Sequence, residues 1–340
     1  MKAAFLIKNG KAEDAFEIRE AETPVPKQGE VLVEVEAFGL NFADVMARLG
    51  HYPDAPPLPA ILGYDVVGRI AELGPGVAHL QKGQRVVALT RFGGYATHAI
   101  ADARAVAPVD EHMDPGIATA LATQACTAIY CAEEMVNMHA GDHVLVHAAA
   151  GGVGTLLVQL ALHRECIVYG TAGTEAKLQY LREMGVQHPI NYRKKDFAVE
   201  VAKIRGKEGL DIIFDPVGGK SIKKGFRLLG AGGRIVSFGA SSLTSTRSFF
   251  GKVRVGVGFG IYHPVAFVSN SKSMLGVNLL RLADHRPQVI QRVMQQAVAH
   301  AQQGILKPRV GGMFPSNQLA GAHHFLESRQ SMGKVVVKWE

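Results

Sequence analysis

The chain has 340 residues, of which 47% are hydrophobic and 20% are charged. This length allows two domains, and the charged fraction is too low for a disordered chain. The net charge is +7, and residues 216–283 hold ten basic residues and no acidic residue. Such a window is typical of a solvated basic face, or of a surface for a nucleic acid, an anionic membrane or a phosphorylated small molecule. The sequence has no zinc-finger spacing and no RNP-type aromatic motif, so we expect no nucleic-acid partner.

Three cysteines, Cys126, Cys131 and Cys166, bear on the compartment of the protein. Their number is odd and none belongs to a C-x-x-C pair, which argues against a disulfide framework and favours a reducing compartment. No apolar stretch reaches the ~18–20 residues that a membrane span needs, and the N-terminus lacks a cleavable secretory pattern. We therefore expect a cytoplasmic protein.

The first part of the chain is predicted to be an irregular, mostly β domain. The segment VLVEVEAFG (31–39) alternates with a period of two, as a half-buried strand does. The segment YPDAPPLPAILG (52–63) has four prolines in twelve residues and cannot form a regular element. Further strand-and-turn pieces follow in GRIAELGPGV and KGQRVVAL.

From about residue 115 the pattern changes to a helical period, and then short apolar runs alternate with helical runs. This alternation predicts an α/β domain with a doubly wound parallel sheet, because continuous apolar strands are typical of burial on both faces. After Gly239 the pattern breaks, and a helix is expected at 287–303 with a closing strand in GKVVVKW. We place one domain at residues 1–122, completed by 273–340, and the α/β domain at 123–272.

A glycine-rich turn stands where the first sheet strand meets the first helix. Residues 147–155 read HAAAGGVGT, directly after the apolar run HVLV. A residue without Cβ lets the backbone approach a pyrophosphate, and the following helix N-terminus supplies free N–H groups and a positive dipole end. The order of strand, glycine turn and helix inside a βα array therefore predicts a dinucleotide site.

The turn has the pattern Ala148-x-x-Gly151-x-x-Gly154, which resembles that of the medium-chain dehydrogenase/reductase superfamily. The surrounding stretch GDHVLVHAAAGGVGTLLVQLA resembles the signature of the zinc-independent quinone oxidoreductase branch, although Leu162 stands where that branch usually has a basic residue or serine. The resemblance extends from MKAAFLIKNG through GLNFADVMARLGHYP and INYR to GKVVV. It implies a GroES-like β domain with a Rossmann domain, and an oxidoreductase activity.

The resemblance also indicates whether the chain has the ligands to bind zinc. Zinc-dependent relatives carry a Cys and a His–Glu pair in the first domain, and often a four-Cys lobe. Here Asn41 stands at the Cys position, Tyr64 and Asp65 stand at the His–Glu positions, and the region of the lobe has no cysteine. Because zinc prefers thiolate and imidazole ligands, we expect no bound metal.

The choice of nicotinamide cofactor depends on the residues after the second strand. An NAD site needs an acidic residue ~20 positions beyond the glycines, to bind the ribose 2′-hydroxyl. The segment GTAGT (170–174) offers none; Glu175 comes next, at a place that also suits the first turn of a helix capped by Thr174. Lys177 lies one turn into that helix, either as a phosphate ligand or as an ordinary exposed lysine. We therefore expect NADPH as cofactor.

The resemblance implies the residues of the site. Gly173, Lys177 and Tyr192, with Arg329, are expected around the 2′-phosphate. Asn41, Tyr52 and Thr127 are expected at the nicotinamide end, with Phe238 and Gly239 after the fifth strand. The full set implied for cofactor binding is Asn41, Thr127, Gly151, Gly152, Val153, Gly154, Gly173, Lys177, Tyr192, Phe238, Gly239 and Arg329.

Without a metal Lewis acid, hydride transfer suits an acceptor that is already electrophilic, such as a quinone or an α,β-unsaturated carbonyl. The candidate catalytic residues are Tyr52, Asn41 and Tyr64. Tyr52 either binds the acceptor oxygen or relays a proton to it, or else is a packing aromatic in a proline-rich loop. Asp44 is interpreted as a local cap, and Asp215 as a residue that shapes the turn in DPVGG.

Residues 247–272 (RSFFGKVRVGVGFGIYHPVAFVSNSK) are rich in glycine, basic and apolar residues. They resemble the vesicle-amine-transport relatives of the branch, which implies a candidate docking surface for an anionic membrane. The alternative, which we favour, is an active-site lid or a dimer contact, and we expect a homodimer.

Overall fold

The computed structural model describes residues 1–245 and 256–339 and divides the chain into two compact units. One unit combines residues 1–126 with 279–340, and the other holds residues 127–278. The sequence predicts boundaries after residues 122 and 272. The second boundary lies further along the chain because Ser273–Gly276 forms a strand of the second unit's sheet.

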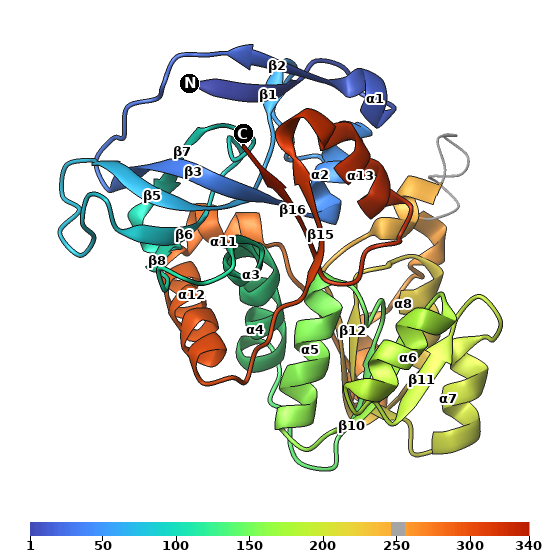
Figure 1. The fold of residues 1–340 in the computed structure, drawn as a ribbon. Coiled ribbons are helices and arrows are strands. Elements are labelled where there is room, and N and C mark those ends of the chain that lie inside the picture. Colours follow the sequence, from blue (N-terminus) through green and yellow to red (C-terminus); the bar gives the residue numbers. More distant parts are fainter. Residues whose placement is uncertain (246–255, 340) are drawn as a thin grey trace. The chain divides into compact units, whose positions relative to one another are not determined.

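The second unit is built around a six-stranded parallel sheet (Figure 1). Its order, β11-β10-β9-β12-β13-β14, is that of a doubly wound dinucleotide-binding sheet. The sequence predicts five of these strands; the four residues of β14 follow a glycine-rich stretch without strand periodicity. The strands are β9 (His143–Val146), β10 (Ile167–Ala172), β11 (His188–Asn191), β12 (Leu210–Asp215), β13 (Leu229–Ser237) and β14 (Ser273–Gly276).

Helices connect the parallel strands of this unit and cover the sheet. α5 (Gly152–His163) packs on β9 and β10, and α6 (Glu175–Glu183) packs on β10 and β11. α8 (Lys220–Leu228) packs on β12 and β13. Because helices occupy the faces of the sheet, the run Val144–Val146 is fully buried, as a continuous apolar strand requires. The remaining elements are α7 (Phe197–Arg205), η4 (Ser241–Ser245) and α10 (Pro264–Asn270).

The first unit is a GroES-like β domain, as the resemblance implies. Its larger sheet has seven strands in the order β15-β16-β3-β5-β6-β8 with β7 paired to β3, and a smaller sheet has the order β2-β1-β4. The strands are β1 (Lys2–Leu6), β2 (Phe16–Glu20), β3 (Glu30–Leu40), β4 (Ala60–Ile61), β5 (Asp65–Leu73), β6 (Arg85–Leu89), β7 (His98–Asp102), β8 (Val106–Pro108), β15 (Val310–Pro315) and β16 (Lys334–Lys338).

The closing strand β16 belongs to the first unit, as the sequence predicts, and it pairs antiparallel with β3. This pairing joins the C-terminal block of the chain to the N-terminal block and brings Val335–Val337 into the core of the unit. The helices of the unit are α1 (Ala12–Ala15), α2 (Phe42–Arg48), η1 (Ala103–Ala105), α3 (Pro115–Ala120), η2 (Leu121–Ala125), α11 (Leu279–His285), α12 (Pro287–Gln302), η5 (Ser316–Gln318) and α13 (Leu319–Glu327). The boundary between the units falls in α4 (Cys126–Ile129), which η3 (Tyr130–Glu134) follows.

Among the described residues, no helix combines the length and the apolar character needed to cross a bilayer.

Candidate cofactor site and active site

The glycine turn after β9 begins with a residue in the left-handed region. Ala148 has φ of 51°, and its carbonyl oxygen accepts a hydrogen bond from the Gly151 N–H at 2.8 Å. A Cβ on Gly154 would lie 2.3 Å from this same oxygen, so only glycine allows α5 to pack so closely. The first-turn N–H groups of Gly152 and Val153 have no acceptor within α5, which begins at Gly152. An open turn with free N–H groups suits a pyrophosphate.

The other predicted cofactor residues of this unit follow the ends of neighbouring strands. Gly173 follows β10, Tyr192 follows β11, and Phe238 and Gly239 follow β13. All strands of the sheet are parallel, so these residues share its carboxyl edge with the glycine turn (Figure 1). The strand order reverses between β9 and β12, and ligands of doubly wound sheets bind at this edge and at this switch point.

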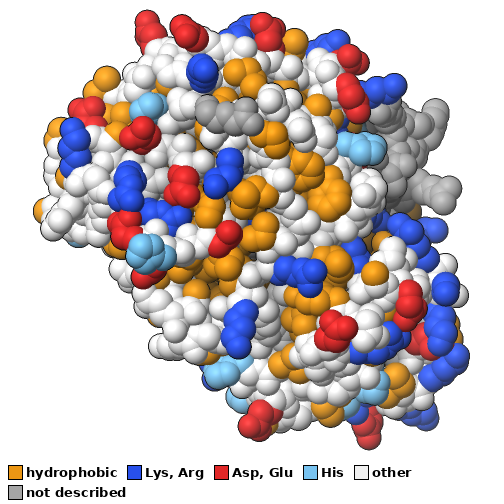
Figure 2. Space-filling view, in the orientation of Figure 1, with side chains coloured by type: hydrophobic (Ala, Val, Ile, Leu, Met, Phe, Trp, Pro, Cys, Tyr) orange, Lys and Arg blue, Asp and Glu red, His pale blue; other side chains and the backbone are white. Residues whose placement is uncertain are grey.

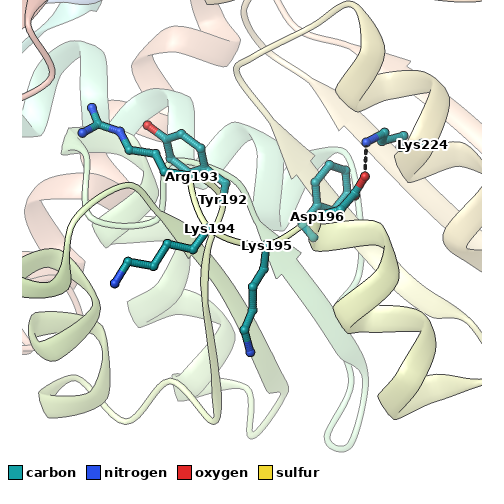
Figure 3. Close-up of a pocket in the computed structure, with 7 residues that line it drawn as sticks. Tyr192, Arg193, Lys194, Lys195, Asp196 and Lys224 are labelled. Carbon is teal, nitrogen blue, oxygen red and sulfur yellow. Dashed lines mark hydrogen bonds and ion pairs between the residues drawn. The ribbon is translucent and has the colours of Figure 1, made fainter.

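Tyr192 lies directly over Gly173. A Cβ on Gly173 would lie 2.7 Å from the Tyr192 hydroxyl and 3.1 Å from Nε of Arg193. Tyr192 and Arg193 contribute to a shallow cavity of about 360 Å³ whose other lining residues include Lys194 and Lys195. Figure 3 shows the Tyr192 hydroxyl and the Arg193 guanidinium side by side and Lys195 pointing away from them. Lys and Arg side chains also gather on the surface over α7 and the loop before it (Figure 2).

Glu175, the first acidic residue after β10, interacts along its own helix. Its Oε1 lies 2.9 Å from the guanidinium of Arg182, two turns further along α6. Thr174 caps the same helix by accepting the Lys177 N–H at 3.4 Å. This ion pair fits the structural role that the sequence allows for Glu175, and Lys177 stands in the first turn of α6, as predicted.

In the first unit, Asn41 belongs to a buried cluster with Asp65 and Lys334. The Lys334 ammonium donates to Asp65 Oδ2 at 2.6 Å and to Asn41 Oδ1 at 3.0 Å. The Asn41 amide donates to the same Asp65 oxygen at 3.0 Å. Lys334 and Asp65 are both 0% exposed, so the ammonium compensates a charge that no solvent reaches. The orientation of the Asn41 amide is therefore set by two partners.

This cluster does not fit a catalytic zinc ion. Asn41 and Asp65 stand at two of the positions where zinc-dependent relatives carry ligands, and an ammonium already lies between their side chains. Zinc prefers thiolate and imidazole over an amide oxygen. Within the described residues, no group of three or more His, Cys, Asp and Glu side chains could hold a metal ion.

Tyr52 and Tyr64 lie in contact in the same unit. Their rings meet edge to face with centroids 6.2 Å apart, and Tyr64 also packs on Phe92. Burial, and then the charge of Asp54, raises the pKa of Tyr52 to about 12. Burial likewise raises the pKa of Tyr64, so both phenols stay protonated and can donate a hydrogen bond at neutral pH.

Asp44 caps α2, as the sequence indicates. Its carboxylate accepts the Asn41 N–H at 2.8 Å and the Gly63 N–H at 3.2 Å. It is 0% exposed, and burial raises its pKa to about 8. Asp215 also has the turn-shaping role expected of it, because its Oδ1 accepts the N–H groups of Val217 and Gly218.

The predicted site residues thus fall into two groups, one in each unit. Thr127 is the first residue of the second unit and is 8% exposed. Arg329 follows α13 in the first unit, with φ of 60°. Sequence reasoning missed Arg193 and Lys334. Arg193 stands beside Tyr192 in INYR and could have been found from that motif, whereas a lysine at the start of a strand carries no signal that it is buried.

The two units match two family models. Residues 27–111 match the alcohol dehydrogenase GroES-like domain, and residues 152–295 match the model described as zinc-binding dehydrogenase. The chain belongs to the medium-chain dehydrogenase/reductase superfamily, and the predicted fold and family are confirmed.

Individual members of the superfamily are similar over nearly the full length of this chain. The synaptic vesicle membrane protein VAT-1 homolog of Rattus norvegicus is 34% identical over 94% of this chain and 79% of its own. The 2-haloacrylate reductase of Burkholderia is 29% identical over 98% of each chain. The crystal structure of Escherichia coli quinone oxidoreductase complexed with NADPH has a TM-score of 0.85 and 26% identity, and the match covers 99% of this chain and 100% of that chain. The similar proteins thus include oxidoreductases and a vesicle membrane protein.

Proposed function

We propose that the protein is a zinc-independent, NADPH-dependent reductase that transfers hydride to a quinone or an α,β-unsaturated carbonyl. The observation that carries this proposal is the second unit's carboxyl edge. There an open glycine turn shares the edge with Gly173, Tyr192 and Arg193. The first acid after β10, Glu175, is paired with Arg182, and Asp196 in the cavity lining is paired with Lys224. A 2′-phosphate at this edge would therefore contact the Tyr192 hydroxyl and the Arg193 guanidinium rather than an unpaired carboxylate.

The residues of the second unit bind and orient the cofactor. The N–H groups of Gly152 and Val153 and the N-terminal dipole of α5 attract the pyrophosphate. Tyr192, Arg193 and Lys177 bind the 2′-phosphate. The nicotinamide, when bound, supplies the hydride, and the protein contributes position and hydrogen bonds.

On the acceptor side we assign Tyr52 the role of hydrogen-bond donor to the acceptor oxygen. Its phenol is protonated at neutral pH, as an ordinary tyrosine is, and burial and Asp54 raise its pKa further, to about 12. Asn41, held by Lys334 and Asp65, has a fixed orientation and one remaining amide N–H. Tyr64 supports the Tyr52 ring by edge-to-face contact. The Lys334 ammonium lies between Asn41 and Asp65, which stand at zinc-ligand positions, and this supports a reaction without a metal Lewis acid.

A hydride-transfer screen tests this function. NADPH and NADH are each offered with a set of quinones and enones, and cofactor oxidation is followed by absorbance. We expect turnover with NADPH and at least one of these acceptors, and a lower kcat for Tyr52→Phe with an unchanged Kd for NADPH. Turnover only with simple alcohols or ketones, and only after zinc is added, would contradict the proposal.

We also propose a cytoplasmic homodimer. The three cysteines are free and buried, which fits a reducing compartment, and β14 forms an edge of the parallel sheet, where a second copy can pair. Light scattering of the purified protein measures the assembly, and a mass of one chain at micromolar concentration would exclude the dimer.

The second candidate function is binding to an anionic membrane. Within 247–272, residues 247–255 lie outside the described residues, but apolar side chains of the remainder are exposed. Val257 is 73% exposed and Ile261 is fully exposed. Val265 and Val268 on α10 are 59% and 83% exposed. No acidic residue occurs in the surrounding window 216–283, so an anionic surface would meet no repulsion from it.

Liposome pelleting separates the two functions. Binding to phosphatidylserine vesicles that weakens with salt, that is absent with phosphatidylcholine and that is lost in Val265→Asp/Val268→Asp would favour the membrane function. Equal pelleting of this variant and the wild type would show that α10 does not bind the membrane.

A further inference from the structure

His147 and Thr171 form a buried contact directly behind the glycine turn. His147 follows β9 and is 3% exposed, and Thr171 belongs to β10 and is 2% exposed. His147 Nδ1 lies 3.1 Å from Thr171 Oγ1. The imidazole ring packs edge to face on Phe197 at 4.5 Å between centroids. The His147 ring is therefore held in place from two sides.

Thr171 in turn holds two successive amides of the turn. The Ala148 N–H donates to its hydroxyl oxygen at 3.2 Å, and the Ala149 N–H donates to its carbonyl oxygen at 3.0 Å. Ala148 has φ of 51°, a conformation that is unfavourable for a residue with a Cβ. The Ala148 carbonyl is the group that Gly151 donates to and that Gly154 packs against. The shape of the pyrophosphate turn therefore depends on Thr171.

The contact with Thr171 also bears on the protonation of His147. Thr171 Oγ1 accepts the Ala148 N–H and keeps one hydrogen to donate and one further lone pair. When this hydroxyl donates to Nδ1, the proton of the neutral ring lies on Nε2, which has no other partner among the described residues. Burial lowers the pKa of His147, which favours this neutral form. The backbone N–H of His147 donates to the Phe214 carbonyl, and the charge of the next residue, Asp215, raises the pKa of the ring against the larger effect of burial.

We propose that His147 and Thr171 are positioning residues of the dinucleotide site. His147, with its proton on Nε2, directs the Thr171 hydroxyl so that its oxygen accepts the Ala148 N–H, and this bond holds the turn in the shape that receives the pyrophosphate. The inference rests on the proposed cofactor binding. NADPH and NADH share the pyrophosphate, so the two residues support the binding of both cofactors equally.

Thr171→Val and Thr171→Ser form the matched pair of variants. Valine keeps the shape of the side chain and removes the acceptor, whereas serine keeps the hydroxyl. Titration of each folded variant with NADPH and with NADH should show about a 2- to 12-fold weaker Kd for both cofactors in Thr171→Val. Thr171→Ser should stay within about twofold of the wild type. The kcat at saturating cofactor should not change, because the effect lies in cofactor binding.

His147→Asn and His147→Phe give a second pair, in case the valine variant does not fold. Asparagine places a carbonyl oxygen near the position of Nδ1, so it should preserve the binding of both cofactors. Phenylalanine has no acceptor there and should weaken the binding of both cofactors as much as Thr171→Val does. Nitrogen-15 NMR of the wild type should show His147 with its proton on Nε2.

Three results would overturn the inference: unchanged Kd values in Thr171→Val and His147→Phe, a loss confined to NADPH, or a proton on Nδ1. A wild type that binds neither cofactor would instead refute the proposed function itself, and the positioning role with it.

Discussion

Lys334 and Asp65 form an ion pair that no solvent reaches: the ammonium lies 2.6 Å from the carboxylate, and both side chains are 0% exposed. Lys334 begins the last strand of the chain and Asp65 begins β5, with β3 between them in the sheet. A Cβ on Gly39, in β3, would lie 2.1 Å from Lys334 Cε and 2.3 Å from Asp65 Oδ1. The two side chains therefore occupy the space beside Gly39, where any other residue would place its Cβ.

Lys334→Met should strongly destabilise the protein, because it leaves the Asp65 carboxylate buried without a partner. Breaking a buried pair in this way typically costs about 3–5 kcal/mol. Urea unfolding at neutral pH measures the loss. The double variant Lys334→Met/Asp65→Asn should recover most of the stability, since it buries no charge. If the single variant loses less than about 1 kcal/mol, the pair is not a compensated buried charge.

Zinc should be far below one atom per chain in protein purified without a chelator, because Lys334 already occupies the space between Asn41 and Asp65. Activity should survive EDTA. Elemental analysis and an assay before and after chelation check both statements. Stoichiometric zinc whose removal abolishes turnover would contradict the metal-free proposal.

Lys177→Ala and Arg193→Ala should each weaken NADPH binding and leave NADH binding almost unchanged, since only NADPH carries the 2′-phosphate. A hydrogen bond to a charged group is typically worth ~1.5–3 kcal/mol, so we expect roughly a 10- to 150-fold loss for each variant. The loss should shrink as salt rises, because the cavity is near the surface.

Lys195→Ala is the matched control for these two variants. Lys195 lines the same cavity as Arg193, but its ammonium pairs with Glu200 at 3.0 Å and points away from Tyr192 (Figure 3). Its NADPH affinity should equal that of the wild type. Equal losses of NADH and NADPH in Lys177→Ala and Arg193→Ala, or a similar loss in Lys195→Ala, would show that these cations do not discriminate between the cofactors.

Asp44 should make the protein less stable as the pH rises toward 8. Burial raises its pKa to about 8 in the folded state, whereas the unfolded value is about 3.9. Between these values the folded state holds a proton that the unfolded state has released, so stability is fully present below the unfolded value and is lost as pH rises through the folded value. A single group changes the free energy of unfolding by at most about 1.4 kcal/mol per pH unit.

Asp44→Asn isolates this contribution. The variant cannot titrate at this position, so the difference in unfolding free energy between wild type and variant should fall steadily from pH 5 to pH 8 and then level off. Urea unfolding at several pH values measures it. A difference that is constant with pH would mean that Asp44 is ionised in the folded protein.

Gly152→Asp should abolish cofactor binding and leave the fold largely intact. Gly152 is the first residue of α5, where a carboxylate would repel the pyrophosphate and a side chain would block the approach of the backbone. Circular dichroism and cofactor titration separate folding from binding. A folded variant with the NADPH affinity of the wild type would mean that the glycine turn serves packing alone.

Much of the second unit could be predicted from local signals in the sequence. The apolar run HVLV, the glycines after it and the helical period of α5 lie within some twenty residues of one another, and they predict the strand, the turn and the helix that the structure shows. β14 is the exception. Its four residues pair with β13, and that pairing, rather than any pattern of its own, makes it a strand.

The two-unit fold and the position of the glycine turn can be predicted from the amino-acid sequence alone, because each depends on residue types at short, regular spacings, and the resemblance of the motifs indicates the family. Which distant side chains meet is settled only in the folded chain. Arg193 lies over Gly173, His147 contacts Thr171, and Lys334 reaches Asp65 from a strand 269 residues later in the chain. Such contacts arise from strand order and burial, which bring together residues that no local pattern connects. A buried lysine in particular is stabilised by its partner, and that partner becomes visible only when the sheet is assembled.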